Sequence, residues 1–185
     1  MDVIGDELAS QNHDSLKKPP PLPRDTLSKV QKISICNGWS IALIGGPATL
    51  VTLVMGDWFS SLIGTLVTLA GVIEINGSQL LKAGDARGCD RIKGAQLLLM
   101  AVLCGYCFFQ IVNFNFHEML ATLPADTRSL VFSLGVGEAG MESLLRQMYL
   151  VVYGCVILAS LLHQGGLFLY YHRSTKAVLT ALQEQ

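Results

Sequence analysis

The chain has 185 residues, of which 51% are apolar and only 15% are charged. Soluble domains carry about a quarter charged residues, and disordered chains combine high charge with few apolar residues, so the composition argues against both classes. The 13 basic and 14 acidic residues give a formal net charge of −1. A chain this close to neutral has no electrostatic footprint for nucleic acid.

Four long apolar stretches dominate the sequence. The hydrocarbon core of a bilayer is about 30 Å thick, and a helix that rises about 1.5 Å per residue needs about 20 residues to cross it. The stretches cover residues 33–55, 58–81, 94–116 and 147–171, and Glu74 is the one Asp, Glu, Lys or Arg within them. We therefore predict an all-α, integral membrane four-helix bundle, with short hairpin loops and one longer outer loop between the third and fourth spans.

The basic residues lie on one side of this arrangement. All of them except Arg128 and Arg146 precede the first span, flank the loop between the second and third spans, or follow the fourth span. Lys and Arg close to a span resist translocation, so this side is expected to be cytoplasmic. The pattern predicts that both termini are cytoplasmic and that the bundle lies in the inner or plasma membrane of the cell.

The two tails differ in composition. Residues 1–28 contain few apolar residues and end near the proline-rich run 19–23, which favours a disordered cytoplasmic tail with polyproline II conformation. Such a run suits a stiff tether, or a docking ligand for an aromatic groove. Residues 29–173 would form the membrane domain. Residues 174–185 would form a second cytoplasmic tail, and residues 173–182, at its start, could fold as a short amphipathic helix.

Two further features concern the helices themselves. Gly45, Gly46 and Pro47 predict a bend in the first span, because proline removes a backbone donor and kinks a helix, while glycines let another backbone approach. In the outer loop, residues 113–123 could prolong the third helix. Residues 128–134 could form a short helix that lies on the membrane surface.

Glu74 is the most informative residue of the spans. A carboxylate in hydrocarbon is costly unless it is protonated, paired or hydrated, so it is a functional-site hypothesis by default. At helical rise, Glu74 and His163 both lie about 12 Å from the inner ends of their spans. Amides and hydroxyls from all four helices fall in the same inner-leaflet band, namely Asn37, Ser40, Ser78, Gln96 and Gln164.

This polar band has two interpretations. It could line a vestibule, open to the cytoplasm, that binds a proton, an ion or a small solute, with Glu74 and His163 as a titrating pair. Alternatively, the same groups could form interhelical hydrogen bonds that fix the register of the helices, each contributing about 0.6 kcal/mol. Hydrogen bonding of that kind does not require a carboxylate, so both interpretations of Glu74 stay open.

The cysteines suggest a redox possibility. None of the five lies in a predicted outer loop, where disulfides form, so free thiols are expected. Cys104 and Cys107 have C-x-x-C spacing, and with four spans this pair resembles the vitamin K epoxide reductase-like and quinone-linked disulfide-forming enzymes. The pair lies near mid-membrane without loop cysteines to relay electrons, and buried cysteine is common as a small apolar residue. No metal or cofactor site is expected, because no set of ligands has suitable spacing.

The loop between the second and third spans carries a charge cluster of Asp85, Arg87, Asp90 and Arg91, which could pair across the loop or bind headgroups. A pattern around it comprises Glu74, Asn76, Gly77, Leu80, Leu81, Gly84, Asp85, Arg87, Gly88 and Gln96. On these residues the chain resembles small, uncharacterised four-span proteins of bacterial inner membranes. The resemblance implies that the inner loop and Glu74 form one local unit, and it implies no activity.

These observations favour a non-enzymatic accessory or scaffolding subunit, because the extramembrane segments are too small for an independent catalytic domain. The alternative is a small channel, or a proton- or ion-coupled carrier, that uses Glu74 and His163 and assembles as a homo-oligomer. A membrane thiol–quinone oxidoreductase is a further alternative. The expected partners are bilayer lipid and either a second copy or another membrane protein, and not nucleic acid.

Overall fold

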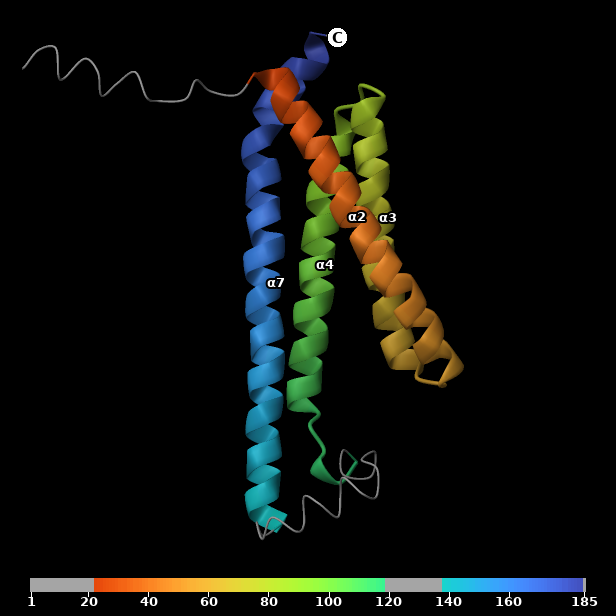
Figure 1. Ribbon diagram of the computed structural model, residues 1–185, viewed down its shortest axis with the longest axis vertical. Coiled ribbons are helices and arrows are strands. Elements are labelled where there is room, and N and C mark those ends of the chain that lie inside the picture. The colour runs from red at the N-terminus through yellow and green to blue at the C-terminus, as the bar shows by residue number, and fades with distance from the viewer. Residues whose placement is uncertain (1–21, 119–137, 185) are drawn as a thin grey trace, which may run out of the picture.

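The computed structural model describes residues 22–118 and 138–184, and these residues fold into four long helices without strands (Figure 1). The helices are α2 (Pro23–Val54), α3 (Trp58–Lys82), α4 (Arg87–Val112) and α7 (Glu138–Gln183). All four are long and apolar enough to cross a membrane. The predicted all-α helical bundle is confirmed, and the chain is a multi-pass membrane protein.

Short turns join the first three helices. Gly56 and Gly84, one in each turn, have φ of +78° and +83°, in the left-handed region that glycine adopts without strain. Asp57 then caps the start of α3, because its side chain accepts a hydrogen bond of 3.0 Å from the backbone N–H of Ser60. Helices that follow one another in the chain are antiparallel and pack side by side.

Helices α2 and α7 are longer than the spans predicted for them. Helix α2 begins at Pro23, ten residues before the predicted span, so residues 23–28 are helical and do not belong to a disordered tail. Proline at the first helical position and Asp25 in the first turn favour this start. Helix α7 continues through Tyr171 to Gln183, so residues 173–182 are not a separate amphipathic helix. Its 46 residues measure about 69 Å, against about 30 Å for the bilayer core.

The expectations for the first span and the outer loop are also modified. Helix α2 runs unbroken through Pro47, and Gly45 lies against α3, where an added Cβ would be 2.7 Å from Thr68 Oγ1. Helix α4 ends at Val112, and Asn113 follows it, where the side-chain Nδ2 donates a hydrogen bond of 2.9 Å to the Phe109 carbonyl. Of the predicted prolongation over residues 113–123, residues 119–123 lie outside the described residues. The short helix predicted at residues 128–134 lies outside the described residues.

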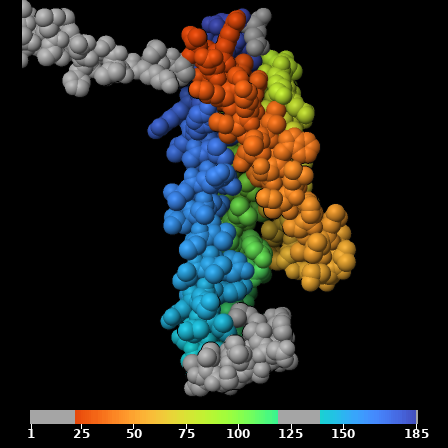
Figure 2. Space-filling model, in the orientation of Figure 1, coloured from red at the N-terminus to blue at the C-terminus, as the bar shows by residue number. Residues whose placement is uncertain are grey.

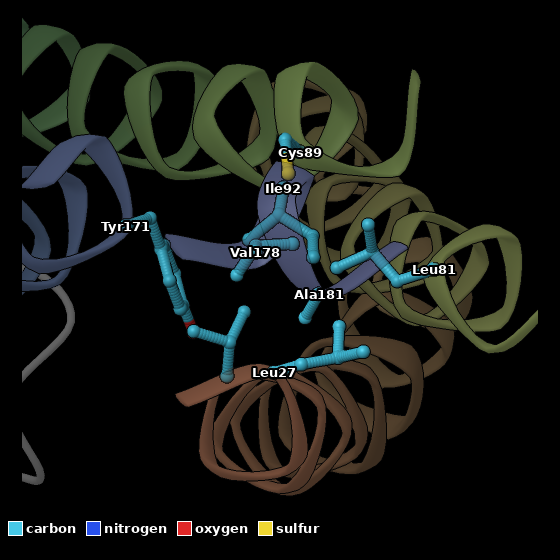
Figure 3. Close-up of a cluster of buried hydrophobic side chains, with 8 residues drawn as sticks. Leu27, Leu81, Cys89, Ile92, Tyr171, Val178 and Ala181 are labelled. Atoms are coloured by element: carbon cyan, nitrogen blue, oxygen red, sulfur yellow. The ribbon is translucent and has the colours of Figure 1, made fainter. Parts of the chain in front are cut away.

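The protein core is concentrated at the end of the bundle where α2 begins and α7 ends. All four helices contribute to it (Figure 3), with Leu27, Val30, Leu81, Cys89, Ile92, Tyr171, Val178 and Ala181. Further along the helices, large apolar side chains such as Leu43 and Leu162 are exposed. Apolar side chains that face lipid lose nothing by exposure, whereas those beyond the bilayer must be buried in protein.

Close backbone contacts hold the helices together near this core. A Cβ added at Gly71 of α3 would lie 2.8 Å from the Gly38 carbonyl oxygen of α2, and one added at Gly77 would lie 3.1 Å from the Gly88 carbonyl oxygen of α4. Gly88 thus serves the packing of α4 on α3. Helices α2 and α7 meet at this end and diverge from it (Figure 1), and Figure 2 shows α4 between them over the rest of that face.

Candidate functional site

Glu74 is the centre of the polar contacts between the helices. It lies on α3, one turn from both Gly71 and Ser78, and its side chain is fully buried at 0% exposure. Asn37 Nδ2, from α2, donates a hydrogen bond of 2.7 Å to Glu74 Oε2. The Tyr171 hydroxyl, from α7, donates one of 3.1 Å to Glu74 Oε1. Each carboxylate oxygen therefore accepts a hydrogen bond from a different helix.

Two buried serines add hydrogen bonds between α2 and α3. Ser34 Oγ donates a bond of 3.2 Å to the backbone carbonyl of Glu74. Ser78 Oγ donates a bond of 3.2 Å in the opposite direction, to the backbone carbonyl of Gln31. Because each hydroxyl bonds to a carbonyl of the facing helix, a sliding motion of α2 along α3 would break both bonds. The pair therefore fixes the register of these two helices.

Gln96 brings α4 to the same cluster. Its side chain is 1% exposed and faces the Glu74 carboxylate. Neither Gln96 Nε2 nor Gln96 Oε1 has a hydrogen-bond partner of good geometry among the described residues. Leaving a buried polar group unpaired costs about 1–3 kcal/mol. The amide therefore places a donor and an acceptor beside the carboxylate, buried between α3 and α4.

His163 does not join this cluster. It is exposed on α7, and its Nδ1 lies 3.0 Å from Oε1 of the buried Gln164. Tyr171, about two turns further along α7, occupies the position at Glu74 that was expected for His163. The physical reason is the length of the helix. Helix α7 continues to Gln183, so the apolar stretch ends at Tyr171 before the helix does. The depth of His163, which was counted from the end of that stretch, therefore does not match the depth of Glu74 on α3.

Ser40 also lies apart from Glu74. It is exposed on α2 and donates a hydrogen bond of 2.8 Å to the Cys36 carbonyl of its own helix, as serine commonly does within a membrane helix. The predicted band is thus divided in two. The structure brings together Asn37, Glu74, Ser78 and Gln96, and it leaves Ser40, His163 and Gln164 outside.

The charges of the loop between α3 and α4 pair differently from the prediction. Asp85 Oδ1 accepts a hydrogen bond of 2.8 Å from the backbone N–H of Arg87. Asp90 Oδ1 lies 2.9 Å from Lys93 Nζ. These pairings arise because α4 begins at Arg87, which places Asp90 and Lys93 one helical turn apart. Within the described residues, no ion pair joins the loop aspartates to Arg87 or Arg91.

Arg91 instead joins α4 to α3. Its Nη1 donates a hydrogen bond of 2.6 Å to Asn76 Oδ1, two residues along α3 from Glu74. Together with the close approach of Gly77 and Gly88, this contact ties the loop to the helix that carries the buried carboxylate.

A second polar cluster, between α4 and α7, was not predicted from the sequence. The Tyr149 hydroxyl donates a hydrogen bond of 3.1 Å to Gln110 Oε1, and Gln110 Nε2 donates one of 2.9 Å to the Tyr106 hydroxyl. The rings of Tyr149 and Tyr153 pack with their centroids 4.5 Å apart. The i, i+4 spacing of both pairs, Tyr106 with Gln110 and Tyr149 with Tyr153, is the signal that places each pair on one helix face.

All five cysteines lie in the described part of the chain, and they carry free thiols. Cys104 and Cys107 are one turn apart on α4, and Cys107 is 1% exposed. A redox thiol must be reached by its quinone or thiol partner, and the packing around Cys107 opposes such access. In residues 22–118 and 138–184, no group of three or more His, Cys, Asp or Glu side chains could hold a metal ion.

Comparisons of the chain with protein-family models, with curated proteins and with solved structures find no match. The resemblance to small four-span bacterial proteins therefore stays a prediction. The interpretation of the site rests on its geometry, a buried carboxylate bonded from α2 and α7 with an unpaired amide of α4 beside it.

Proposed function

We propose that the chain is a non-enzymatic accessory or scaffolding subunit of a membrane assembly, in which Glu74 is a structural hub. The enclosure of Glu74 carries the proposal. Its side chain is 0% exposed, and both carboxylate oxygens accept hydrogen bonds, from Asn37 and Tyr171. A carboxylate held in this way joins α2, α3 and α7 at one point. A solute-binding group needs a path to solvent, whereas a hub does not.

The divergence of α2 and α7 away from the hub supports the binding of a partner helix in the membrane. Beyond the shared end the two helices separate (Figure 1). In lipid, helices associate through close packing at small residues and not through the hydrophobic effect. Gly154 and Gly165 of α7, about three turns apart on one face of the helix, have open space where a Cβ would be, so the backbone of another helix can approach there. We propose that this face of α7 receives a transmembrane helix of a partner or of a second copy.

Gentle co-purification tests this function. The full chain, tagged at one end and solubilised in mild detergent, should retain one membrane protein, or a second copy, in fixed stoichiometry. Gly154→Leu should release that partner and leave the bundle folded. Gly105→Leu is the matched control, since Gly105 is an equally open helical glycine on α4. A monomer without partners, before and after cross-linking in intact cells, would contradict the proposal.

A proton- or ion-coupled carrier is the second candidate, and the buried, unpaired Gln96 amide beside Glu74 favours it. In proteoliposomes, such a carrier would show pH-dependent flux that Glu74→Gln and Gln96→Leu both abolish. Tyr106→Phe, in the other polar cluster, would leave that flux intact. A scaffold gives no flux above that of empty liposomes, and Glu74→Gln then changes only the stability of the bundle.

The cytoplasmic location of both termini is part of the same proposal. Reporter fusions at residues 1, 86 and 185 should report the cytoplasm, and a fusion at residue 125 should report the opposite side. The physical reason is the set of basic residues near the start of α2, the end of α3 and the start of α4, together with Arg173 and Lys176 of α7. An outside signal at residue 86 would overturn this orientation.

A further inference from the structure

Two neighbouring cavities open beside the start of α2. The larger, of about 500 Å³, is lined by Arg24, Leu27, Ser28, Gln31, Lys82 and Glu184. The smaller, of about 330 Å³, is lined by Ser28, Gln31, Lys32, Ile35, Cys36 and Lys82. Ser28, Gln31 and Lys82 line both, so the cavities share a wall. They draw on α2, α3 and the residue that follows α7, at the end of the bundle that holds the core.

The lining of these cavities is cationic. Among the described residues that line them, three are cationic, Arg24, Lys32 and Lys82, and one is acidic, Glu184. Arg24 donates its hydrogen bond of 3.3 Å to the backbone carbonyl of Glu184. Among the described residues, Lys32 and Lys82 form no ion pair with a carboxylate. Two ammonium groups and a guanidinium, beside the neutral donors of Ser28 and Gln31, are the set of donors that phosphate oxygens accept.

The cavities lie at the boundary of the apolar segments. Lys32 directly precedes the apolar stretch of α2, and Lys82 directly follows that of α3. Ile35 and Cys36, which line the smaller cavity, lie on the apolar side of this boundary. The lining therefore changes from cationic to apolar along α2. A phospholipid changes in the same order, from its phosphate to its glycerol and acyl chains, and basic residues at this level attract anionic headgroups.

We propose that these two cavities form a binding site for a phosphate group, carried by the headgroup of an anionic phospholipid. Lys82, common to both cavities, contacts the phosphate. Arg24 and Lys32 neutralise it from either side, and Ile35 packs against the glycerol and acyl region. The site adjoins the Glu74 cluster at Gln31, whose backbone carbonyl accepts the hydrogen bond from Ser78, but it does not depend on the proposed scaffolding role.

Native mass spectrometry of the full chain in neutral detergent tests this site, with phosphatidylglycerol, phosphatidylcholine and inorganic phosphate as probes. We expect phosphatidylglycerol to bind in preference to phosphatidylcholine. Lys82→Gln should weaken that binding about fivefold, which corresponds to about 1 kcal/mol for one cation, and Lys82→Arg should restore it. Lys29→Gln is the matched control. Lys29 is an exposed lysine on the turn of α2 that carries Ser28 and Gln31, but it lines neither cavity.

The comparisons between variants and between probes decide the outcome. Equal losses for Lys29→Gln and Lys82→Gln, or equal affinities for the two lipids, would show diffuse surface charge and overturn the proposal. Ile35→Ser distinguishes the source of the phosphate, since it should weaken phosphatidylglycerol binding and leave binding of inorganic phosphate unchanged. If inorganic phosphate competes with the lipid at equal concentration and Ile35→Ser has no effect, the lipid source is rejected.

Discussion

The phenolic hydroxyl of Tyr171 reaches Glu74 Oε1 at 3.1 Å, across 97 residues of sequence. The ring of Tyr171 is 4% exposed and packs in the apolar core at the end of the bundle (Figure 3). One side chain thus belongs to the apolar core by its ring and to the polar cluster by its hydroxyl, as the amphipathic character of tyrosine allows. This contact links the core, which lies where α7 leaves the apolar segment, to the buried carboxylate.

Tyr171→Phe should lower the free energy of unfolding by about 1 kcal/mol. The ring and its packing remain, and the lost hydrogen bond lies between the membrane average of about 0.6 kcal/mol and the larger values of about 1.5–3 kcal/mol for bonds to charged groups. Reversible unfolding in mixed detergent–lipid micelles measures it. Tyr170→Phe is the control, since the Tyr170 hydroxyl has no hydrogen bond within the described residues. Equal effects of the two changes would contradict a role for the contact.

Asn37→Ala and Tyr171→Phe should not be additive. Both side chains donate to the same carboxylate, so the loss of both leaves Glu74 without either partner. A double-mutant cycle should give a coupling of about 0.5–3 kcal/mol, the range for residues in one hydrogen-bond network. Asn37→Ala combined with Tyr149→Phe should be additive within about 0.5 kcal/mol, because Tyr149 belongs to the other cluster. Additivity in both cycles would mean that Glu74 is not a shared hub.

The parts of the fold that lipid dictates could be predicted from the sequence. Four helices, two short turns and a buried carboxylate follow from the length and composition of the apolar stretches, because a bilayer leaves few alternatives. Asn37 and Gln96 were also placed correctly at the level of Glu74. Their helices, α2 and α4, are joined to α3 by short turns. These turns fix the depth of residues on α2 and α4 relative to Glu74, so the depths counted from the sequence are nearly correct.

The parts that protein packing dictates could not be predicted in the same way. Helices α2 and α7 extend beyond the apolar stretches, and their extensions pack together. Leu27 of α2 and Val178 of α7 are both buried in the core at this end of the bundle, which lipid does not define. Hydropathy ends where lipid ends, so it gave no sign that α7 continues to Gln183. That continuation is why His163 was expected at Glu74 and why Tyr171, assigned to the edge of the span, was overlooked.

Gly71→Ala should destabilise the bundle by about 1–3 kcal/mol, the usual range for overpacking. The added Cβ would lie 2.8 Å from the Gly38 carbonyl oxygen and 3.0 Å from the Ala42 backbone nitrogen, so α2 must move away from α3. Gly94→Ala is the matched control. Nothing lies within 4 Å of its added Cβ, and alanine should raise helix stability by up to about 1 kcal/mol. The same sign for both changes in thermal unfolding would refute the close packing of α2 on α3.

The Asp57 cap of α3 should make stability depend on pH. Two hydrogen bonds from Ser60, a larger effect from its side chain and a smaller one from its backbone N–H, hold the pKa of Asp57 below the ordinary value of about 3.9. Because the pKa is lower in the folded state, the ionised cap stabilises the fold above the unfolded pKa. That stabilisation is lost as the pH falls through the folded pKa. Asp57→Ala should therefore lower the unfolding temperature at pH 7, and the difference from the parent chain should shrink below about pH 4.

Asp57→Asn separates the cap from its charge. Asparagine keeps an acceptor for the Ser60 N–H and carries no titrating group. This variant should therefore retain most of the capping at pH 7, and its unfolding temperature should show no contribution from titration of residue 57 between pH 5 and pH 3. Thermal unfolding of the parent chain and both variants at pH 7, 5 and 3, in one detergent, measures these differences. An equal deficit of Asp57→Ala at pH 7 and pH 3 would mean that the carboxylate does not cap α3 through its ionised form.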